Sequence, residues 1–155
     1  MALCGHFLPR FRGTCIGVGG LFVVIAGSEL AQGVAHSMDG FGIPAEVLRA
    51  PHYQDAMRFV FVHMLTLGVV IATVGAVLEA PRARRVFARV MAALMLLYTV
   101  LDVRTSDSAL GSHLYLGARS LVPVAIDVVV LLLFVHLSWC TRATAAAPGP
   151  SAPGP

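Results

Sequence analysis

Residues 118–139 decide the fold class, and they read ARSLVPVAIDVVVLLLFVHLSW, an apolar run with few polar interruptions. About 20 predominantly apolar residues are enough for an α-helix to cross a hydrocarbon core of about 30 Å. Three stretches of similar character precede this one, namely Thr14–His36, Ala56–Leu78 and Val86–Val103. The sequence therefore predicts an all-α integral membrane protein with four transmembrane helices.

The composition also favours a membrane environment. Hydrophobic residues make up 57% of the 155-residue chain and charged residues 12%, whereas about 25% of the residues in ordinary soluble domains are charged. A soluble chain of this size has too little interior to bury so much apolar surface. The formal charge of +3 does not indicate nucleic-acid binding, because the arginines flank apolar segments and form no basic stripe.

The arginines are distributed unevenly among the connections. Seven lie before the first span, in or just after the connection between the second and third, or after the fourth: Arg10, Arg12, Arg82, Arg84, Arg85, Arg89 and Arg142. The two remaining connections hold the other four, Arg49, Arg58, Arg104 and Arg119. Because positively charged flanks stay in the cytoplasm, this bias predicts an inner-membrane protein with both termini and the turn at 79–85 in the cytoplasm.

The chain divides into three predicted parts: a basic lead-in at 1–13, a transmembrane domain at 14–141 and a disordered Ala/Pro/Gly tail at 142–155. Short connections favour antiparallel neighbours, so we expect an up-down-up-down bundle. Pro81 is expected to start the third helix, and the turn-rich first connection has room for a short interfacial helix at Ala45–Ala50. Close helix packing is predicted at small residues with one-turn spacing: Gly13 and Gly17, and Gly68, Ala72 and Ala76 with Gly75 alongside.

The first span has a second interpretation. Its basic start, apolar middle and small residues Gly33 and Ala35 are typical of a secretory signal with a cleavage site. Against cleavage, Glu29, Gln32 and His36 would share one face of a continuous helix. The stretch is therefore predicted to be a membrane span. Cleavage, which would remove Glu29 from the mature chain, is the alternative.

Ionisable residues gather in the half of the predicted bundle that faces away from the cytoplasm. Glu29 and Asp127 are the most costly, since a charge at mid-membrane costs about 2.5–3.5 kcal/mol. Their expected partners are Arg58, Arg119 and His63. Glu29 or Asp127 is the candidate general acid and His63 the candidate base. Arg119, Pro123 and Asp127 are expected to share one face of the fourth helix, where Pro123 kinks the helix and leaves the Arg119 carbonyl facing the same pocket. The pocket is completed by His36, Arg58, Tyr98, Asp102 and Arg119.

The alternative interpretation of the boundary residues is purely interfacial. Arg58, Asp102 and Arg119 lie near the ends of their spans, where long side chains reach the headgroups. Asp55 and Arg58 also have the i, i+3 spacing of a surface ion pair. No metal or cofactor is expected, because the chain contains no E-x-x-H pair, no CxxC pair and no P-loop, Rossmann or nucleophile-elbow motif.

Several short motifs carry a family resemblance. They are Gly20-Leu21-Phe22 in the first span, Phe41-Gly42-Ile43-Pro44 after it and Gly117-Ala118-Arg119 before the fourth. With Gly27, Arg58 and the glycine-bearing second span, the chain resembles small four-span bacterial membrane proteins of the DoxX-like group and related families of unknown function. The resemblance covers roughly residues 16–138 and implies the fold. The oxidoreductase association of some members is not expected here, because the chain lacks a redox cysteine pair.

Three functions are compatible with these observations. The leading hypothesis is a polar pocket in the outer-leaflet half that binds, and in a catalytic version isomerises or cyclises, a small apolar or lipid-like molecule. The alternative is a non-catalytic accessory or assembly subunit that contacts membrane-protein partners or further copies of itself. A proton or small-solute pathway is disfavoured, since it needs polar groups through the full membrane thickness and the other half is apolar.

Overall fold

The computed structural model describes the backbone of residues 11–143 and the side chains of residues 11–139. Each of the long helices is long and apolar enough to cross a membrane. The predicted all-α, four-span architecture is therefore confirmed for a multi-pass membrane protein. Residues 1–10 and 144–155, which hold most of the predicted lead-in and tail, lie outside the described part. The long helices are α1 (Phe11–Gln32), α4 (Pro51–Val77), α5 (Pro81–Thr105) and α6 (Leu121–Ala143).

Three short elements lie in the connections: α2 (Val34–Ser37), α3 (Ala45–Arg49) and the 3-10 turn η2 (Ala118–Ser120). The α3 helix confirms the expected short helix in the first connection. Pro81 begins α5 as predicted, and Pro51 begins α4 ahead of the predicted start at Ala56. Proline suits the first turn, where its missing N–H would have no helical partner.

The first predicted span ends early, at Gln32. Gly33 follows with a φ of 86°, a left-handed conformation that residues with a Cβ rarely adopt. The Ser37 hydroxyl then donates to the backbone carbonyl of Glu29 at 3.2 Å. His36 consequently lies on the separate helix α2. The prediction that Glu29 and His36 share a face of one continuous helix was wrong, because Gly33 interrupts it.

The fourth predicted span also divides near its start. Arg119 lies in the 3-10 turn η2, and Pro123 is the third residue of α6. A proline in the first turn displaces no helical hydrogen bond. Arg119, Pro123 and Asp127 therefore do not lie along one regular helix with a central kink.

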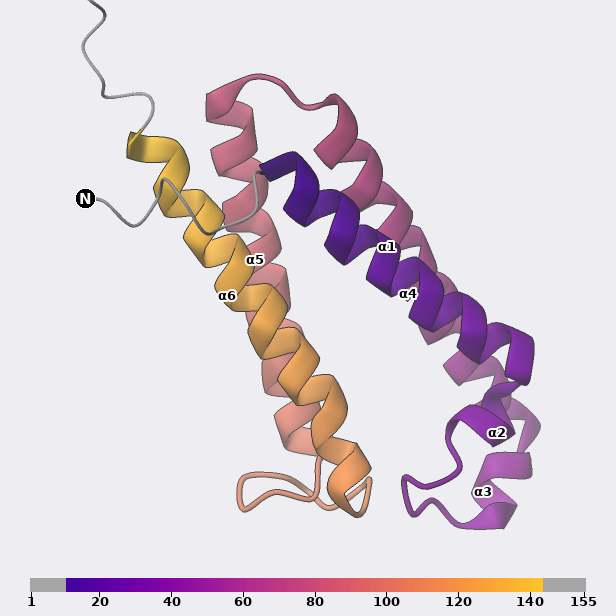
Figure 1. Cartoon of the computed structure of the whole chain (residues 1–155). Coiled ribbons are helices and arrows are strands. Elements are labelled where there is room, and N and C mark those ends of the chain that lie inside the picture. The colour runs from indigo at the N-terminus through magenta and orange to yellow at the C-terminus, as the bar shows by residue number, and fades with distance from the viewer. Residues whose placement is uncertain (1–10, 144–155) are drawn as a thin grey trace, which may run out of the picture.

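The long helices pack as two antiparallel pairs, α1 along α4 and α5 along α6 (Figure 1). The pairs lie near each other at the α4–α5 turn and diverge toward the opposite end. We call the end that holds residues 78–80 the turn end. We call the opposite end, where residues 33–50 and 106–120 lie, the loop end.

Glycines bring the backbones of α1 and α4 together. A Cβ on Gly19 would lie 2.5 Å from the carbonyl oxygen of Gly68, and a Cβ on Gly68 would lie 2.7 Å from that of Gly19. A Cβ on Gly75 would likewise collide with α1. Small residues thus form this helix contact in the manner known from membrane proteins. Gly13 and Gly17 take no part, because nothing lies within 4 Å of a Cβ at either position.

The larger apolar core lies toward the turn end and includes residues from all the long helices. The ring of Phe87 meets Phe11 and Phe134 edge-on, with centroids 6.1 and 6.3 Å apart. The Arg84 guanidinium lies 5.4 Å from the centroid of the Phe11 ring, and its Nε donates to the Leu78 carbonyl at 2.7 Å. These contacts fasten the two helix pairs to each other at this end.

At the loop end, the connections rather than the long helices join the two pairs. Tyr115 packs against a second apolar cluster formed by the first three helices of the chain and α4. Its ring meets Phe41 edge-on at 5.7 Å, and the Leu116 N–H donates to the Phe41 carbonyl at 2.8 Å. Arg119 Nη1 donates to the Asp39 carbonyl at 2.9 Å.

Candidate functional site

Two acidic side chains meet between α5 and α6. Asp102 lies near the end of α5 and Asp127 near the start of α6, so the antiparallel packing of these helices brings them together. Their carboxyl groups share a hydrogen bond, and both side chains are half-buried. Since a carboxylate has only acceptors, this bond needs a proton on one of the two groups. We call Asp102 and Asp127 the carboxyl pair.

The carboxyl pair has a definite chemical capacity. A proton shared by its two groups leaves several acceptor lone pairs between two apolar helices. Hydroxyl and amine groups are the natural partners of such a site, because each donates a hydrogen bond. A bound molecule could therefore be anchored there by a polar end while its apolar part remains among the helices.

Glu29 is a further acid with unused hydrogen-bonding capacity. Its side chain on α1 is half-buried, and its Oε2 atom is buried with no hydrogen-bond partner among the described residues. A buried acceptor without a partner is costly, and in folded proteins such atoms usually mark a bound water, a ligand or a functional group. Glu29 thus stays a candidate on a helix other than those of the carboxyl pair.

None of the other candidate residues forms a hydrogen bond with the carboxyl pair in the described part of the chain. His63 is exposed, with its ring 5.0 Å from that of Phe59, and His36 and Tyr98 are also exposed. Arg58 forms an ion pair with Asp55 at 3.0 Å, with side chains 58% and 72% exposed, as the surface alternative predicted. Of the candidate residues, all of which the structure describes, only Asp102 and Asp127 are joined by a hydrogen bond.

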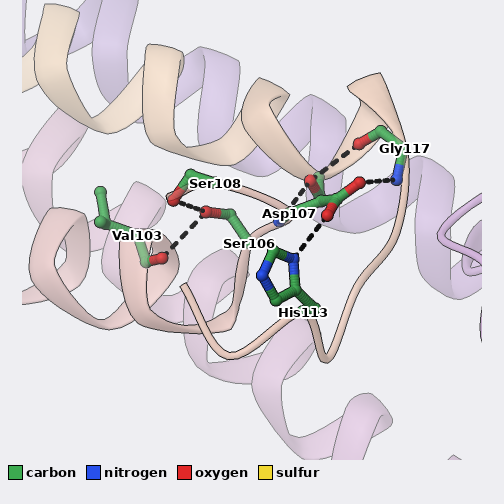
Figure 2. Close-up of polar contacts among 7 residues, drawn as sticks. Val103, Ser106, Asp107, Ser108, His113 and Gly117 are labelled. Carbon is green, nitrogen blue, oxygen red and sulfur yellow. Dashed lines mark hydrogen bonds and ion pairs between the residues drawn. The ribbon is translucent and has the colours of Figure 1, made fainter. Parts of the chain in front are cut away.

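A second polar cluster orders the connection between α5 and η2, and Figure 2 shows it. Asp107 accepts a hydrogen bond on Oδ2 from the Gly117 N–H at 3.0 Å, and its Oδ1 lies 2.6 Å from His113 Nδ1. The Ser120 hydroxyl accepts from the Asp107 N–H at 3.0 Å and donates to the Gly117 carbonyl at 2.8 Å. We call these four residues the Asp107 cluster.

The electrostatics of the Asp107 cluster favour a charged carboxylate. The hydrogen bond from the Gly117 N–H, followed by the contact with His113, lowers the pKa of Asp107 below its ordinary value. Both carboxylate oxygens are engaged inside the connection, and His113 adopts a φ of 54°. The cluster therefore holds the connection in shape, with the Asp107 carboxylate as its centre.

A buried serine supports the same connection from the helix side. Ser106 directly follows α5, and its hydroxyl donates to the Val103 carbonyl at 2.9 Å and lies 2.9 Å from the Ser108 hydroxyl (Figure 2). A Cβ on Gly111 would collide with the Ser106 carbonyl. The sequence gives little sign of this architecture, because its hydrogen bonds use short polar side chains and backbone groups that occur in any loop.

No group of three or more His, Cys, Asp or Glu side chains within residues 11–139 could hold a metal ion. Comparisons with protein-family models, with curated proteins and with solved structures find no match to the chain. The resemblance to the DoxX-like group therefore stays a prediction. The carboxyl pair and Glu29 remain the strongest functional candidates on geometric grounds.

Proposed function

We propose that this multi-pass membrane protein binds a small amphipathic or lipid-like molecule in the half of the bundle toward the loop end. The carboxyl pair is its polar anchor. The observation that carries the proposal is the hydrogen bond between Asp102 and Asp127, two acids on different membrane-spanning helices. Neither acid forms an ion pair with an arginine in the described part of the chain.

The energetics of membrane helices support a functional role for this pair. Acids within membrane-spanning helices are costly, up to about 2.5–3.5 kcal/mol at the helix centre, so such residues are rare and usually mark pathways or ligand sites. A structural requirement at one helix contact would be met at lower cost by small or apolar residues. A ligand hydroxyl or amine gives the carboxyl pair a partner that apolar side chains cannot replace.

The catalytic version of the proposal assigns Asp127 or Glu29 as the general acid and His63 as the base, in an isomerase or cyclase reaction. His63 is exposed on α4 and forms its ring contact with Phe59. Binding at the carboxyl pair does not depend on His63, so the molecule can bind whether or not it is then transformed.

Native mass spectrometry of the purified full-length chain tests the binding proposal. We expect the wild type to retain a small molecule of defined mass through purification. The double variant Asp102→Asn/Asp127→Asn should lose that molecule, because an amide offers neither the acidic proton nor the charge of a carboxyl group. Glu46→Gln is the matched control, since Glu46 is an exposed acid on α3 outside the spans.

The binding proposal fails if the double variant and the wild type retain the same adducts at the same occupancy. Helical content measured by circular dichroism must be equal in all variants, so that lost binding is not lost folding. If the double variant does not fold, Asp127→Asn alone provides the same comparison.

A second candidate function is that of a subunit in a membrane complex, and the open arrangement of the helix pairs favours it. Toward the loop end α5 leaves much of its circumference exposed, with Leu96, Leu97, Val100 and Leu101 each about half exposed at 48–54%. A second chain or lipid tails would cover this surface. The same native mass spectra distinguish the two functions, because a subunit should retain a protein partner or a second copy at fixed stoichiometry.

For localisation we propose the inner membrane with both termini in the cytoplasm. The support is the excess of arginine in the segments on that side. Alkaline phosphatase fused after Gly111 should be active, and phosphatase fused after Ala80 should be inactive. The reverse pattern would invert the orientation without altering the fold.

A further inference from the structure

The turn end holds a concentration of positive charge that the proposed function does not use. The first nine residues of α5 include Arg82, Arg84, Arg85 and Arg89, and its first turn contains no acidic residue. The N-terminus of a helix carries a partial positive charge and unpaired N–H groups, so cations there are unfavourable and an anion is favoured. An anion bound near the start of α5 would therefore stabilise it.

Within residues 11–139, a single one of these arginines has its guanidinium engaged by other residues. Arg84 donates to the Leu78 carbonyl and lies over the Phe11 ring. The ion pairs among the described residues involve Arg58 and His113 and none of the arginines of α5. The Nε of Arg85 is buried and has no hydrogen-bond partner in the described part of the chain.

The remaining arginines surround a hollow that continues into an apolar groove. Arg82, Arg85 and Arg89 line a hollow of about 290 Å³ together with Val86. An adjoining open groove of about 620 Å³ runs between the end of α4 and the start of α5, where Val74, Leu78 and Phe87 contribute to its wall. The two spaces share Arg82 and Val86, so basic and apolar surfaces are continuous.

We propose that this combined site binds one anionic phospholipid. The guanidinium groups of Arg82, Arg85 and Arg89 bind the phosphate, since planar guanidinium groups match phosphate oxygens in charge and geometry. An acyl chain lies in the groove along Val74, Leu78, Val86 and Phe87. The ends of α4 and α5 are also the ends of two membrane spans, which places the site where headgroups meet hydrocarbon.

Charge complementarity favours this occupant over a soluble anion. A free phosphate would use the arginines alone and leave the adjoining apolar wall exposed. A lipid without net charge would fill the groove and leave the positive charge of the arginines uncompensated. An anionic phospholipid satisfies both surfaces, and its site lies at the opposite end of the spans from the carboxyl pair.

Lipid titration of the full-length protein, followed by native mass spectrometry, tests the site. The probes are phosphatidylglycerol, phosphatidylcholine and inorganic phosphate. We expect phosphatidylglycerol to bind preferentially. The variant Arg85→Gln/Arg89→Gln should weaken its binding by about tenfold or more, as expected for the loss of charged hydrogen bonds. Arg104→Gln, an exposed arginine at the other end of α5, is the matched control and should bind like the wild type.

Several outcomes would overturn the proposal. Equal binding of phosphatidylcholine, whose phosphate is balanced by a quaternary ammonium, would show that the arginines do not select a net negative charge. Equally tight binding of inorganic phosphate would show that the groove contributes nothing. An equal loss in Arg104→Gln would show a general charge effect. If the double variant does not fold, Arg89→Gln alone carries the test, because Arg89 is exposed. Asp102→Asn/Asp127→Asn should leave phosphatidylglycerol binding unchanged, which separates this site from the proposed ligand site.

Discussion

Arg119 Nη1 donates a hydrogen bond to the backbone carbonyl of Asp39 at 2.9 Å, across a sequence separation of 80 residues. The contact is tight on both sides, because a Cβ on Gly40 would lie 2.5 Å from the same Arg119 nitrogen. It connects the segment after α2 with η2, and so joins the two helix pairs at the loop end. An arginine expected to line a ligand pocket serves here to dock one loop on another.

Replacing Arg119 should loosen this docking. We expect Arg119→Gln to speed hydrogen–deuterium exchange at the Leu116 N–H, whose acceptor is the Phe41 carbonyl in the docked segment. The net cost should be about 0.5–1.5 kcal/mol, as for a typical hydrogen bond. Arg104→Gln is the control, because Arg104 is an exposed arginine in the last turn of α5. Unchanged exchange at Leu116 in Arg119→Gln would show that the arginine does not hold the loops together.

The glycine contact between α1 and α4 should tolerate no side chain. Gly19→Leu places new atoms against the backbone of Gly68, so α1 and α4 must separate. Overpacking of a well-packed contact costs about 1–3 kcal/mol, and backbone cannot yield as a flexible side chain can. The thermal midpoint of the purified protein should fall.

Gly17→Leu is the matched control for that experiment, since nothing lies within 4 Å of a Cβ at Gly17. Both variants add the same apolar side chain to the same helix. Equal midpoints for the two variants would rule out the close approach of α1 and α4 at Gly19.

The break between α1 and α2 should depend on glycine. Gly33→Ala forces a Cβ into a backbone with φ of 86°, and such sparsely populated backbone conformations cost about 1–3 kcal/mol. We expect a lower thermal midpoint and a changed position of His36. Gly27→Ala is the control, because Gly27 lies within α1 beside open space and alanine favours a helix by about 0.5–1 kcal/mol. A stabilised Gly33→Ala variant would contradict the break.

The Asp107 cluster should respond to pH with a definite sign. The pKa of Asp107 is lowered in the folded chain, chiefly by the Gly117 N–H. Its stabilising effect is therefore fully present above the ordinary carboxyl pKa of about 4 and is lost as the pH falls through the lower folded value. We expect fluorescence from a probe attached at position 110 to report loosening only in that acidic range.

Asp107→Asn should remove this pH response and leave the connection loose at neutral pH. One amide oxygen cannot replace a carboxylate that faces both Gly117 and His113. Asp39→Asn provides the control, since the Asp39 side chain is exposed and only its backbone carbonyl binds Arg119. A pH response that persists in Asp107→Asn would assign the effect to another group.

The sequence predicted the helices well because their signals are local. Runs of apolar residues predicted all the spans, and Pro81 predicted the start of α5. The spacing of Asp55 and Arg58 predicted their ion pair. The role of Gly68 and Ala72 in helix packing also followed from their spacing, although Gly19, rather than Gly13 or Gly17, is their partner on α1.

The partners of the polar residues could not be predicted in the same way. A helix that is apolar on every side has no strong preference for one rotation about its axis, so the sequence does not show that Asp127 faces Asp102. Arg119 binds a backbone carbonyl, which every residue offers. The contact between Asp107 and His113 depends on the left-handed backbone of His113, which residue type alone does not indicate.

The pairing of α1 with α4 and of α5 with α6 has a consequence for biogenesis. Each pair consists of consecutive spans, so the first can complete its glycine-lined contact in the bilayer while the ribosome is still synthesising the second. Assembly then requires only that two preformed hairpins meet through Phe87 and its neighbours. Contacts between segments close in sequence form quickly, which shortens the time that the nascent chain exposes its acids to lipid.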